Sequence, residues 1–409
     1  MFDTILALSL LLFLSKLIGN IFSRIKQPAI LGELTAGILL GVHVLGPFLF
    51  SEPLYKIEYM QVLSQIGAMF LLFMAGYSHV KIDKLLQFGG RSIAIACVEL
   101  PLSFAAGFWV GRLFDYSIIA SLFTGLALSI TGIGVTVRTL MDLNRLHTDY
   151  GMNILGIAIL DATFGLFFLS FLAAFAHSQE AISLYTIGIT ILKIGFFFGG
   201  AVLFSRVVLF PIALLADYMN VAESKLGLVL STLFVFSYVA DWVGLHFIIG
   251  SFVAGIIIAR HSDFTQKEIK NKLNGIAYGL FVPIFFGVMG AQIDFGVLKN
   301  GGLFAMAFIL TGMSAKFLGG TLGAKITGYP VMKSLVLGTG LIPRAGVGLA
   351  TASIALSAGI IDEKIFAAVV GMVAVTVIFT PLALKYAIQI LEKNKKTSAT
   401  HCLKYPDIF

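Results

Sequence analysis

Charged side chains are scarce in this chain of 409 residues. Asp, Glu, Lys and Arg together make up 12% of the sequence, whereas a typical soluble domain carries about 25%. Hydrophobic residues make up 58%, and the mean hydropathy is +0.97. The composition therefore excludes an ordinary soluble protein. It predicts an all-α polytopic membrane protein.

Cysteine is also rare, with only Cys97 and Cys402 present. Two cysteines in such different segments predict neither a disulfide framework nor a thiolate metal site. The sequence also has no nucleotide-binding loop and no soluble catalytic constellation. We therefore expect no enzyme, no cofactor and no resident metal. The net charge of +7 needs no nucleic-acid partner, because topology explains it.

Apolar runs recur along the whole chain. A membrane-spanning helix needs roughly 17 to 25 predominantly apolar residues. Thirteen segments meet this requirement, at about 4–22, 28–47, 58–79, 91–113, 117–140, 149–176, 183–211, 222–242, 244–260, 275–293, 302–325, 330–358 and 364–391. We expect one membrane domain over residues 1–391 and a short cytoplasmic tail over 392–409.

Basic residues are distributed unequally between alternate loops. With the N-terminus outside, the inner loops and the tail hold twenty Lys and Arg residues, Arg138 among them, and the outer loops hold four. Cytoplasmic loops of membrane proteins carry an excess of Lys and Arg. The sequence therefore predicts an outside N-terminus, a cytoplasmic C-terminus and an odd number of spans.

Asp161 lies in the middle of an apolar run, residues 151–176, that contains no other charged residue. A charge at the centre of a bilayer costs about 3 kcal/mol on insertion scales. An isolated carboxylate avoids this cost by taking up a proton or by binding a cation. Those two states together describe a cation/proton exchange site, with the transported Na⁺ or K⁺ at Asp161.

Four basic residues lie within predicted spans, namely Lys16, Lys193, Lys316 and Arg344, and the first two are close enough to helix ends to reach the membrane interface. Lys316 is central in the eleventh span, so its ammonium needs a carboxylate partner or must lose its proton. Glu33 and Glu99 are the additional intramembrane acids. Arg344 is expected either to neutralise a helix end or to hold one of these acids through a forked hydrogen bond.

The fifth predicted span contains a polar, glycine-rich stretch at 129–136, SITGIGVT. Gly132 and Gly134 weaken the continuity of the helix. The hydroxyl groups of Ser129 and Thr131 offer oxygen ligands for a cation, and hydrogen bonds between helices are their alternative role.

The twelfth predicted span contains a second interruption, formed by Pro343, Arg344 and Gly346. Spans five and twelve are seven helices apart, so they run in opposite directions, as an inverted repeat requires. Two broken helices in corresponding places point to the site of a secondary transporter, although either break alone is also compatible with an ordinary kink. The same repeat makes Glu99 and Lys316 approximate counterparts.

Seven short segments carry a family resemblance over nearly the whole chain. They are 30–41, 131–138, 156–165, 248–255, 281–290, 316–319 and 343–349. In this order they resemble the monovalent cation/proton antiporters of the bacterial NapA and KefC type. The resemblance implies two inverted repeats with crossed discontinuous helices, the NhaA/NapA-like antiporter fold, in a bacterial inner membrane.

The resemblance also implies a homodimer in the lipid bilayer that exchanges Na⁺ or K⁺ for H⁺. Residues of about 1–80 and 222–293 would form a dimerisation scaffold. Residues of about 91–176 and 302–391 would form a mobile transport core, and 183–211 would link the two parts. Movement of the core against the scaffold would give alternating access.

The chain departs from this family at the sixth span. The family usually has two adjacent polar residues there, and the second, an aspartate, carries the cation and the proton. Aligned through Gly165, Asp161 takes the first position and Ala162 the second. Gly346 likewise replaces a usual acid. The resemblance further implies an ion pair between Asp161 and Lys316.

Three interpretations of this pair stay open. A cation at Asp161 displaces the Lys316 ammonium, which then releases a proton; or the pair is purely structural; or the substrate has changed. The loss of acids while Lys316 and Arg344 persist favours a proton-coupled transporter of an anion or small organic solute as the alternative function. A non-transporting receptor is the third class.

Overall fold

The computed structural model describes residues 2–41, 44–79, 82–178, 184–219, 221–261, 264–293, 295–344, 348–349, 352, 355–356 and 359–404. These residues form helices and turns, and no strand occurs among them. The helices are α1 (Phe2–Arg24), α2 (Ile30–Leu39), α3 (Gly46–Leu49), η1 (Leu54–Lys56), α4 (Glu58–His79), α5 (Ile82–Leu113), α6 (Ile118–Ser129), α7 (Ile133–Asp142), α8 (Asp149–Ser178), α9 (Leu184–Leu203), η2 (Phe204–Val208), α10 (Leu209–Tyr218), α11 (Ser224–Trp242), α12 (Phe247–Ile258), α13 (Lys267–Ile276), η4 (Ala277–Phe281), α14 (Val282–Ala291), α15 (Phe295–Ile326), α16 (Val331–Gly340) and α18 (Glu363–Lys404).

The helices have the length and composition of membrane spans. Within the described residues, nine helical segments are long and apolar enough to cross a bilayer. Two shorter apolar helices, α2 and α12, lie inside the second and ninth predicted spans. The all-helical, multi-spanning class is therefore confirmed, and the number of thirteen spans stays a prediction.

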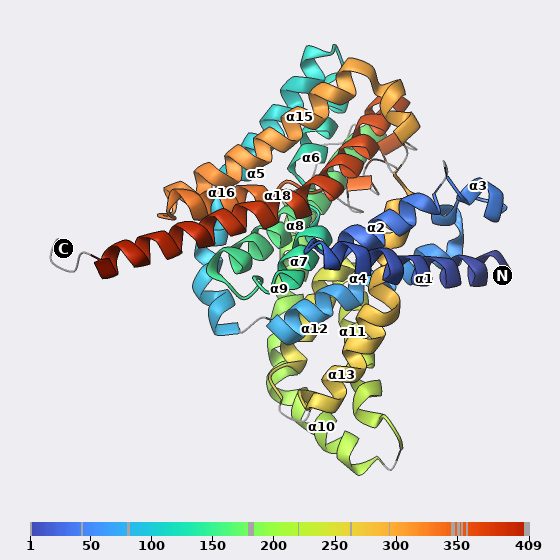
Figure 1. The fold of residues 1–409 in the computed structure, drawn as a ribbon, viewed down its shortest axis with the longest axis vertical. Helices are drawn as coiled ribbons and strands as arrows, with labels where there is room; N and C mark the ends of the chain where they lie inside the picture. The colour runs from blue at the N-terminus through green and yellow to red at the C-terminus, as the bar shows by residue number, and fades with distance from the viewer. Residues whose placement is uncertain are drawn as a thin grey trace.

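The helices pack in two groups (Figure 1). The first group contains α5, α6, α8, α15, α16 and α18. The second group contains α1, α2, α4, α11, α12 and α14. Helix α7 contacts members of both groups, since it packs on α8 and α18 and also on α2 and α4. The break between α6 and α7 therefore lies close to where the two groups meet.

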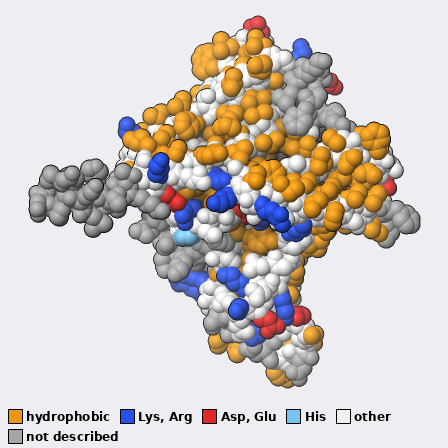
Figure 2. Space-filling model, viewed as in Figure 1, with side chains coloured by type: hydrophobic (Ala, Val, Ile, Leu, Met, Phe, Trp, Pro, Cys, Tyr) orange, Lys and Arg blue, Asp and Glu red, His pale blue; other side chains and the backbone are white. Residues whose placement is uncertain are grey.

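Large apolar side chains cover much of the molecular surface (Figure 2). Phe48 is 86% exposed and Leu303 is 73% exposed, values that would be unfavourable for so many side chains in water. The band of Lys and Arg in Figure 2 leaves broad hydrophobic areas beside it. This surface matches a protein whose sides face lipid.

Two element boundaries differ from a simple run of spans. The predicted seventh span, 183–211, is followed by further helix, because α9 continues through the π-helical η2 into α10 as far as Tyr218. Helix α15 bends at Gly302, where φ is 52° and ψ is −144°. A positive φ of this kind is tolerated by glycine, and the predicted eleventh span begins at this bend.

Candidate functional site

Both predicted helix breaks are present. Helix α6 ends at Ser129 and α7 begins at Ile133, so the first break is shorter than the stretch 129–136 and places Gly134 in the first turn of α7. Helix α16 ends at Gly340, and residues 341–344 are non-helical. The predicted break residue Gly346 lies outside the described residues.

The two breaks contact each other directly. The backbone N–H of Gly132 donates to the carbonyl of Pro343 at 2.6 Å. The Thr136 hydroxyl donates to the carbonyl of Gly340 at 2.7 Å. These bonds satisfy backbone groups that the interrupted helices leave without intrahelical partners, as a non-aqueous environment requires. Segments about two hundred residues apart in the sequence thus form one polar centre.

Arg344 caps the ends of both half-helices. Its side chain is 1% exposed, and its Nη2 donates to the carbonyl of Leu128 in α6 at 2.5 Å. Its Nη1 donates to the carbonyl of Ile342 at 2.9 Å. A cation at two helix C-termini offsets their partial negative charge. Of the two roles expected for Arg344, neutralising helix ends is the one observed; the expected bonds to Glu33 or Glu99 are not formed among the described contacts.

Asp161, on α8, reaches this centre from a third direction. Its side chain is fully buried, and its Oδ2 accepts from Lys316 Nζ at 2.8 Å. The Thr131 hydroxyl, from the first break, donates to the same oxygen. The contact between Asp161 and Lys316 that the resemblance implied is therefore present. Thr131 is also placed as expected for a ligand-bearing residue.

Lys316 binds a second carboxylate as well. Its Nζ pairs with Glu99 Oε1, which also accepts from the Ser103 hydroxyl at 2.9 Å. Glu99 lies on α5 and is fully buried, as Lys316 is on α15. Sequence reasoning treated Glu99 as a supporting charge and missed this contact. One feature of the sequence could have indicated the contact: Glu99 is an acid within a predicted span, and the repeat makes it the counterpart of Lys316.

Ser129 is tied to its own helix. Its hydroxyl donates to the carbonyl of Leu126 at 2.8 Å, and no hydrogen bond to Asp161 is among its described contacts. This is the local hydrogen-bonding role that serine commonly takes in membrane helices. Thr131 is therefore the better candidate for a cation ligand.

Glu33 belongs to a separate buried cluster. It binds Arg138, with Nη2 and Oε1 3.1 Å apart, and Arg138 Nε lies 3.2 Å from Asp142 Oδ1. The Arg138 guanidinium also stacks 4.7 Å above the Tyr278 ring. Arg138, which we expected in an inner loop, instead lies inside α7 with 7% exposure. The ion pair of Arg138 and Glu33 therefore links α7 to α2, a helix of the second group.

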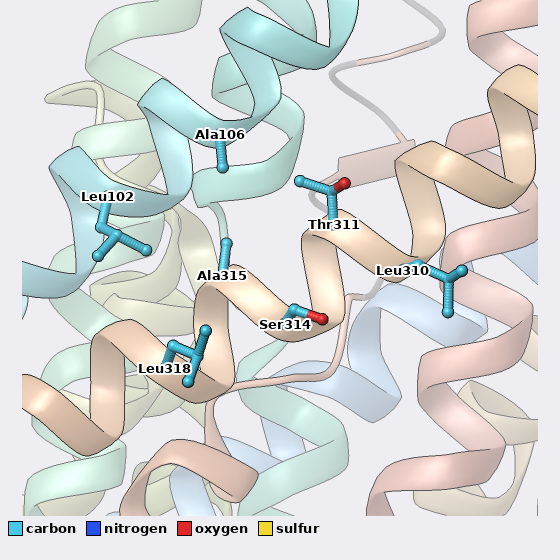
Figure 3. A pocket seen from close by; sticks show the side chains of 7 residues that line it. All are labelled: Leu102, Ala106, Leu310, Thr311, Ser314, Ala315 and Leu318. Carbon is cyan, nitrogen blue, oxygen red and sulfur yellow. The ribbon is translucent and has the colours of Figure 1, made fainter.

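A hollow of about 360 Å³ lies between α5 and α15 (Figure 3). It is lined by Leu102, Ala106, Leu310, Thr311, Ser314, Ala315 and Leu318. This lining contains no charged group. The hollow therefore adds no ionisable group to the polar centre.

On the cytoplasmic side predicted by charge, a polar cluster joins α8 to α16. Lys333 pairs with Asp149, and Asn153 Nδ2 donates to the Tyr329 hydroxyl at 2.8 Å. Burial raises the pKa of Tyr329 above its ordinary value, so its hydroxyl stays neutral. This cluster holds the inner ends of the helices that carry Asp161 and the second break.

Comparison with known proteins gives a consistent result. A family model described as "Sodium/hydrogen exchanger, transmembrane" matches residues 9–388. The Na(+)/H(+)-K(+) antiporter GerN of Bacillus cereus is 31% identical over 397 residues, 97% of this chain and 99% of that protein. The high-affinity Na(+)/H(+) antiporter NhaS3 of Synechocystis sp. is 29% identical over 431 residues, 97% of this chain and 91% of that protein.

The fold has a counterpart among solved structures. The sodium proton antiporter MjNhaP1 from Methanocaldococcus jannaschii matches with a TM-score of 0.68, covering 93% of this chain and 95% of that chain. The two sequences are 16% identical. The likeness therefore extends over nearly all of both folds.

Proposed function

The chain belongs to the sodium/hydrogen exchanger family, and from this premise we propose how it exchanges a monovalent cation, Na⁺ or K⁺, for protons across the membrane. It is a secondary active transporter and not an enzyme. The observation that carries the proposal is the buried ion pair of Asp161 and Lys316 beside two contacting helix breaks. This ion pair identifies the side chains that would bind the cation and release the proton.

Asp161 holds the cation in this proposal. The Thr131 hydroxyl, which already contacts the Asp161 carboxylate, adds a neutral oxygen ligand. Entry of a cation adds one positive charge to a site that is closed to water, where an uncompensated charge is costly. The site therefore releases a proton, by breaking either an N–H bond of the Lys316 ammonium or the O–H bond of the carboxyl group of Glu99 that contacts it. One cation then exchanges for one proton.

The finer architecture is also part of the proposal. Thirteen spans would form two inverted repeats, with the breaks of α6–α7 and α16 as counterparts. The group containing α5, α6, α8, α15, α16 and α18 would be the mobile core, and the group around α2, α4, α12 and α14 would be the dimer scaffold. The close packing within each group and the sparser boundary at α7 support such a division.

The same proposal gives the chain an outside N-terminus and a cytoplasmic C-terminus in a bacterial inner membrane. The excess of basic residues in alternate loops supports this orientation. Homodimerisation is proposed from the family resemblance.

An anion or organic-solute transporter is less well supported by the geometry. That alternative depended on an excess of positive charge left by the missing acids. Glu99 and Asp161 meet Lys316 directly, and Arg344 is engaged by backbone carbonyls. The two basic side chains of the centre are therefore both engaged within the protein. A non-transporting receptor would have no need of such buried charges.

The test uses purified protein in liposomes that carry an imposed pH gradient. Addition of Na⁺ or K⁺ is expected to dissipate the gradient with wild-type protein, and Asp161→Asn to reduce the rate at least tenfold, because a neutral amide cannot offset the charge of a bound cation. Asp241→Asn, the same change at an exposed residue of α11, is the control and should retain the wild-type rate. Absence of any cation response in the wild type between pH 6 and 9 would reject the function.

A further inference from the structure

The second carboxylate of the site comes from a different helix from the one the family pattern indicates. The position after Asp161 is Ala162, which is fully buried and has no ionisable group. Lys316 nevertheless bridges two acids, Asp161 of α8 and Glu99 of α5. The chain therefore keeps two carboxylates around one lysine although the adjacent aspartate is absent.

Each of these carboxylates keeps one oxygen free. Lys316 occupies Asp161 Oδ2 and Glu99 Oε1. The other two oxygens, Asp161 Oδ1 and Glu99 Oε2, are buried and have no hydrogen-bond partner among the described residues. A buried oxygen without a donor is costly, and a bound cation or a proton removes that cost.

The other buried acid cluster has a different chemistry. Glu33 Oε2 also lacks a partner, but Glu33 pairs with Arg138. A guanidinium stays charged at any physiological pH, and Asp142 already shares it. Lys316 also divides one positive charge between two carboxylates, but this group of three contacts the first helix break through Thr131. One elementary charge, from a proton or a monovalent cation, is needed to neutralise this group of three.

Glu99 is held in this place by its surroundings. Ser103, one turn further along α5, donates to Glu99 Oε1 at 2.9 Å. On the facing helix, a Cβ at Gly319 would lie 3.0 Å from Glu99 Cα, so glycine is what permits α15 to approach α5 this closely. Gly319 is one helical turn after Lys316. The packing thus brings the two side chains together.

From these contacts we infer that Glu99 is the second cation ligand and the proton carrier of the site, in place of the absent aspartate. This inference rests on the proposed exchange function. A partly dehydrated Na⁺ or K⁺ binds Asp161 Oδ1 and Glu99 Oε2, while Lys316 stays charged on the other two oxygens. Without the cation, Glu99 Oε2 carries a proton. Cation entry breaks that O–H bond, and the proton leaves to water on the side that is open.

The decisive variant is Glu99→Gln, which keeps the shape of the side chain and cannot ionise. In weakly buffered detergent solution, Na⁺ addition to the wild type is expected to release protons that a pH-indicator dye detects, and Glu99→Gln is expected to abolish this release. The exchange rate in liposomes should fall at least tenfold. If Lys316 were the proton source, Glu99→Gln would still release protons, and that result would overturn the inference.

A second variant tests whether Glu99 carries the exchanged proton or only supports the structure of the site. Glu99→Asp retains the ionisable group, so it should recover cation-driven proton release with a displaced pH midpoint. A purely structural Glu99 would leave the midpoint of Glu99→Asp at the wild-type value, which would count against the inference. Thermal unfolding of each purified variant checks that it is folded, and Glu268→Gln on the exposed face of α13 is the control for the amide change.

The outcomes also separate this inference from the function itself. A wild type without any cation-driven proton movement rejects the exchange function. A wild type that exchanges, together with a Glu99→Gln variant within twofold of its rate, rejects only the role of Glu99.

Discussion

Lys316 has no exposed surface and depends on two carboxylates for its charge. Placing an ammonium in a low-dielectric interior costs several kcal/mol unless its partners compensate. The reverse also holds, because Asp161 and Glu99 would both be uncompensated without the lysine. At the scale of single residues, the stability of this centre is therefore a property of three side chains together.

Lys316→Ala is expected to lower the free energy of unfolding by about 3 to 5 kcal/mol, because it leaves buried carboxylates unpaired. The loss should shrink in acid, where the carboxyl groups are neutral. Thermal unfolding in detergent at several pH values measures both effects.

Lys325→Ala, an exposed lysine of the same helix, provides the matched control and should change stability by less than about 0.5 kcal/mol. Equal stability of Lys316→Ala and the wild type across the pH range would mean that the three charges do not support one another.

At the scale of elements, Arg344 connects the two helices α6 and α16, which both end at a break. It donates to Leu128 in α6 and to Ile342 beyond α16, while the Gly132 N–H bonds to Pro343. The planar guanidinium suits this task, because its donors point in several fixed directions at once. The contact between the two breaks is thus held by the Arg344 side chain, by the Thr136 hydroxyl and by backbone groups.

Arg344→Ala is expected to cost about 3 kcal/mol or more, since two charge-assisted hydrogen bonds of about 1.5 to 3 kcal/mol each are lost. Arg344→Lys should recover only part of this stability, because an ammonium cannot span both helix ends. Thermal unfolding and exchange rate in liposomes are the measurements.

For comparison, Arg145→Ala removes a half-exposed pair with Glu392 and should cost about 1 kcal/mol or less. A loss of similar size for Arg344→Ala and Arg145→Ala would contradict the capping role.

At the scale of the whole molecule, the two helix groups meet at α7 and at the Arg138 cluster. In the proposed mechanism one group moves against the other, and a boundary with few contacts permits such a movement more readily than a continuous core. The orientation of the molecule in the membrane decides whether a given movement exposes the site to the outside or to the cytoplasm.

Thiol labelling tests that orientation in a background that carries Cys97→Ser and Cys402→Ser. In intact bacterial cells, a membrane-impermeant maleimide should label Glu52→Cys, in the outer loop before η1, without disruption of the cells. Lys270→Cys, on the inner segment α13, should be labelled only after permeabilisation, because charge places it in the cytoplasm. Both residues are exposed. The opposite pattern would reverse the proposed topology.

The sequence by itself determined the membrane class and the two helix breaks, and it singled out Asp161 and Lys316 as charges buried within apolar segments. These features are local: the length of an apolar run, a glycine or proline within it, and the cost of a charge at mid-membrane can each be judged from neighbouring residues. Only the tertiary structure decided which charges pair, joining Glu99 to Lys316 and Glu33 to Arg138. Pairing depends on how distant helices approach and rotate against one another, and the spacing of residues along one helix does not contain that information.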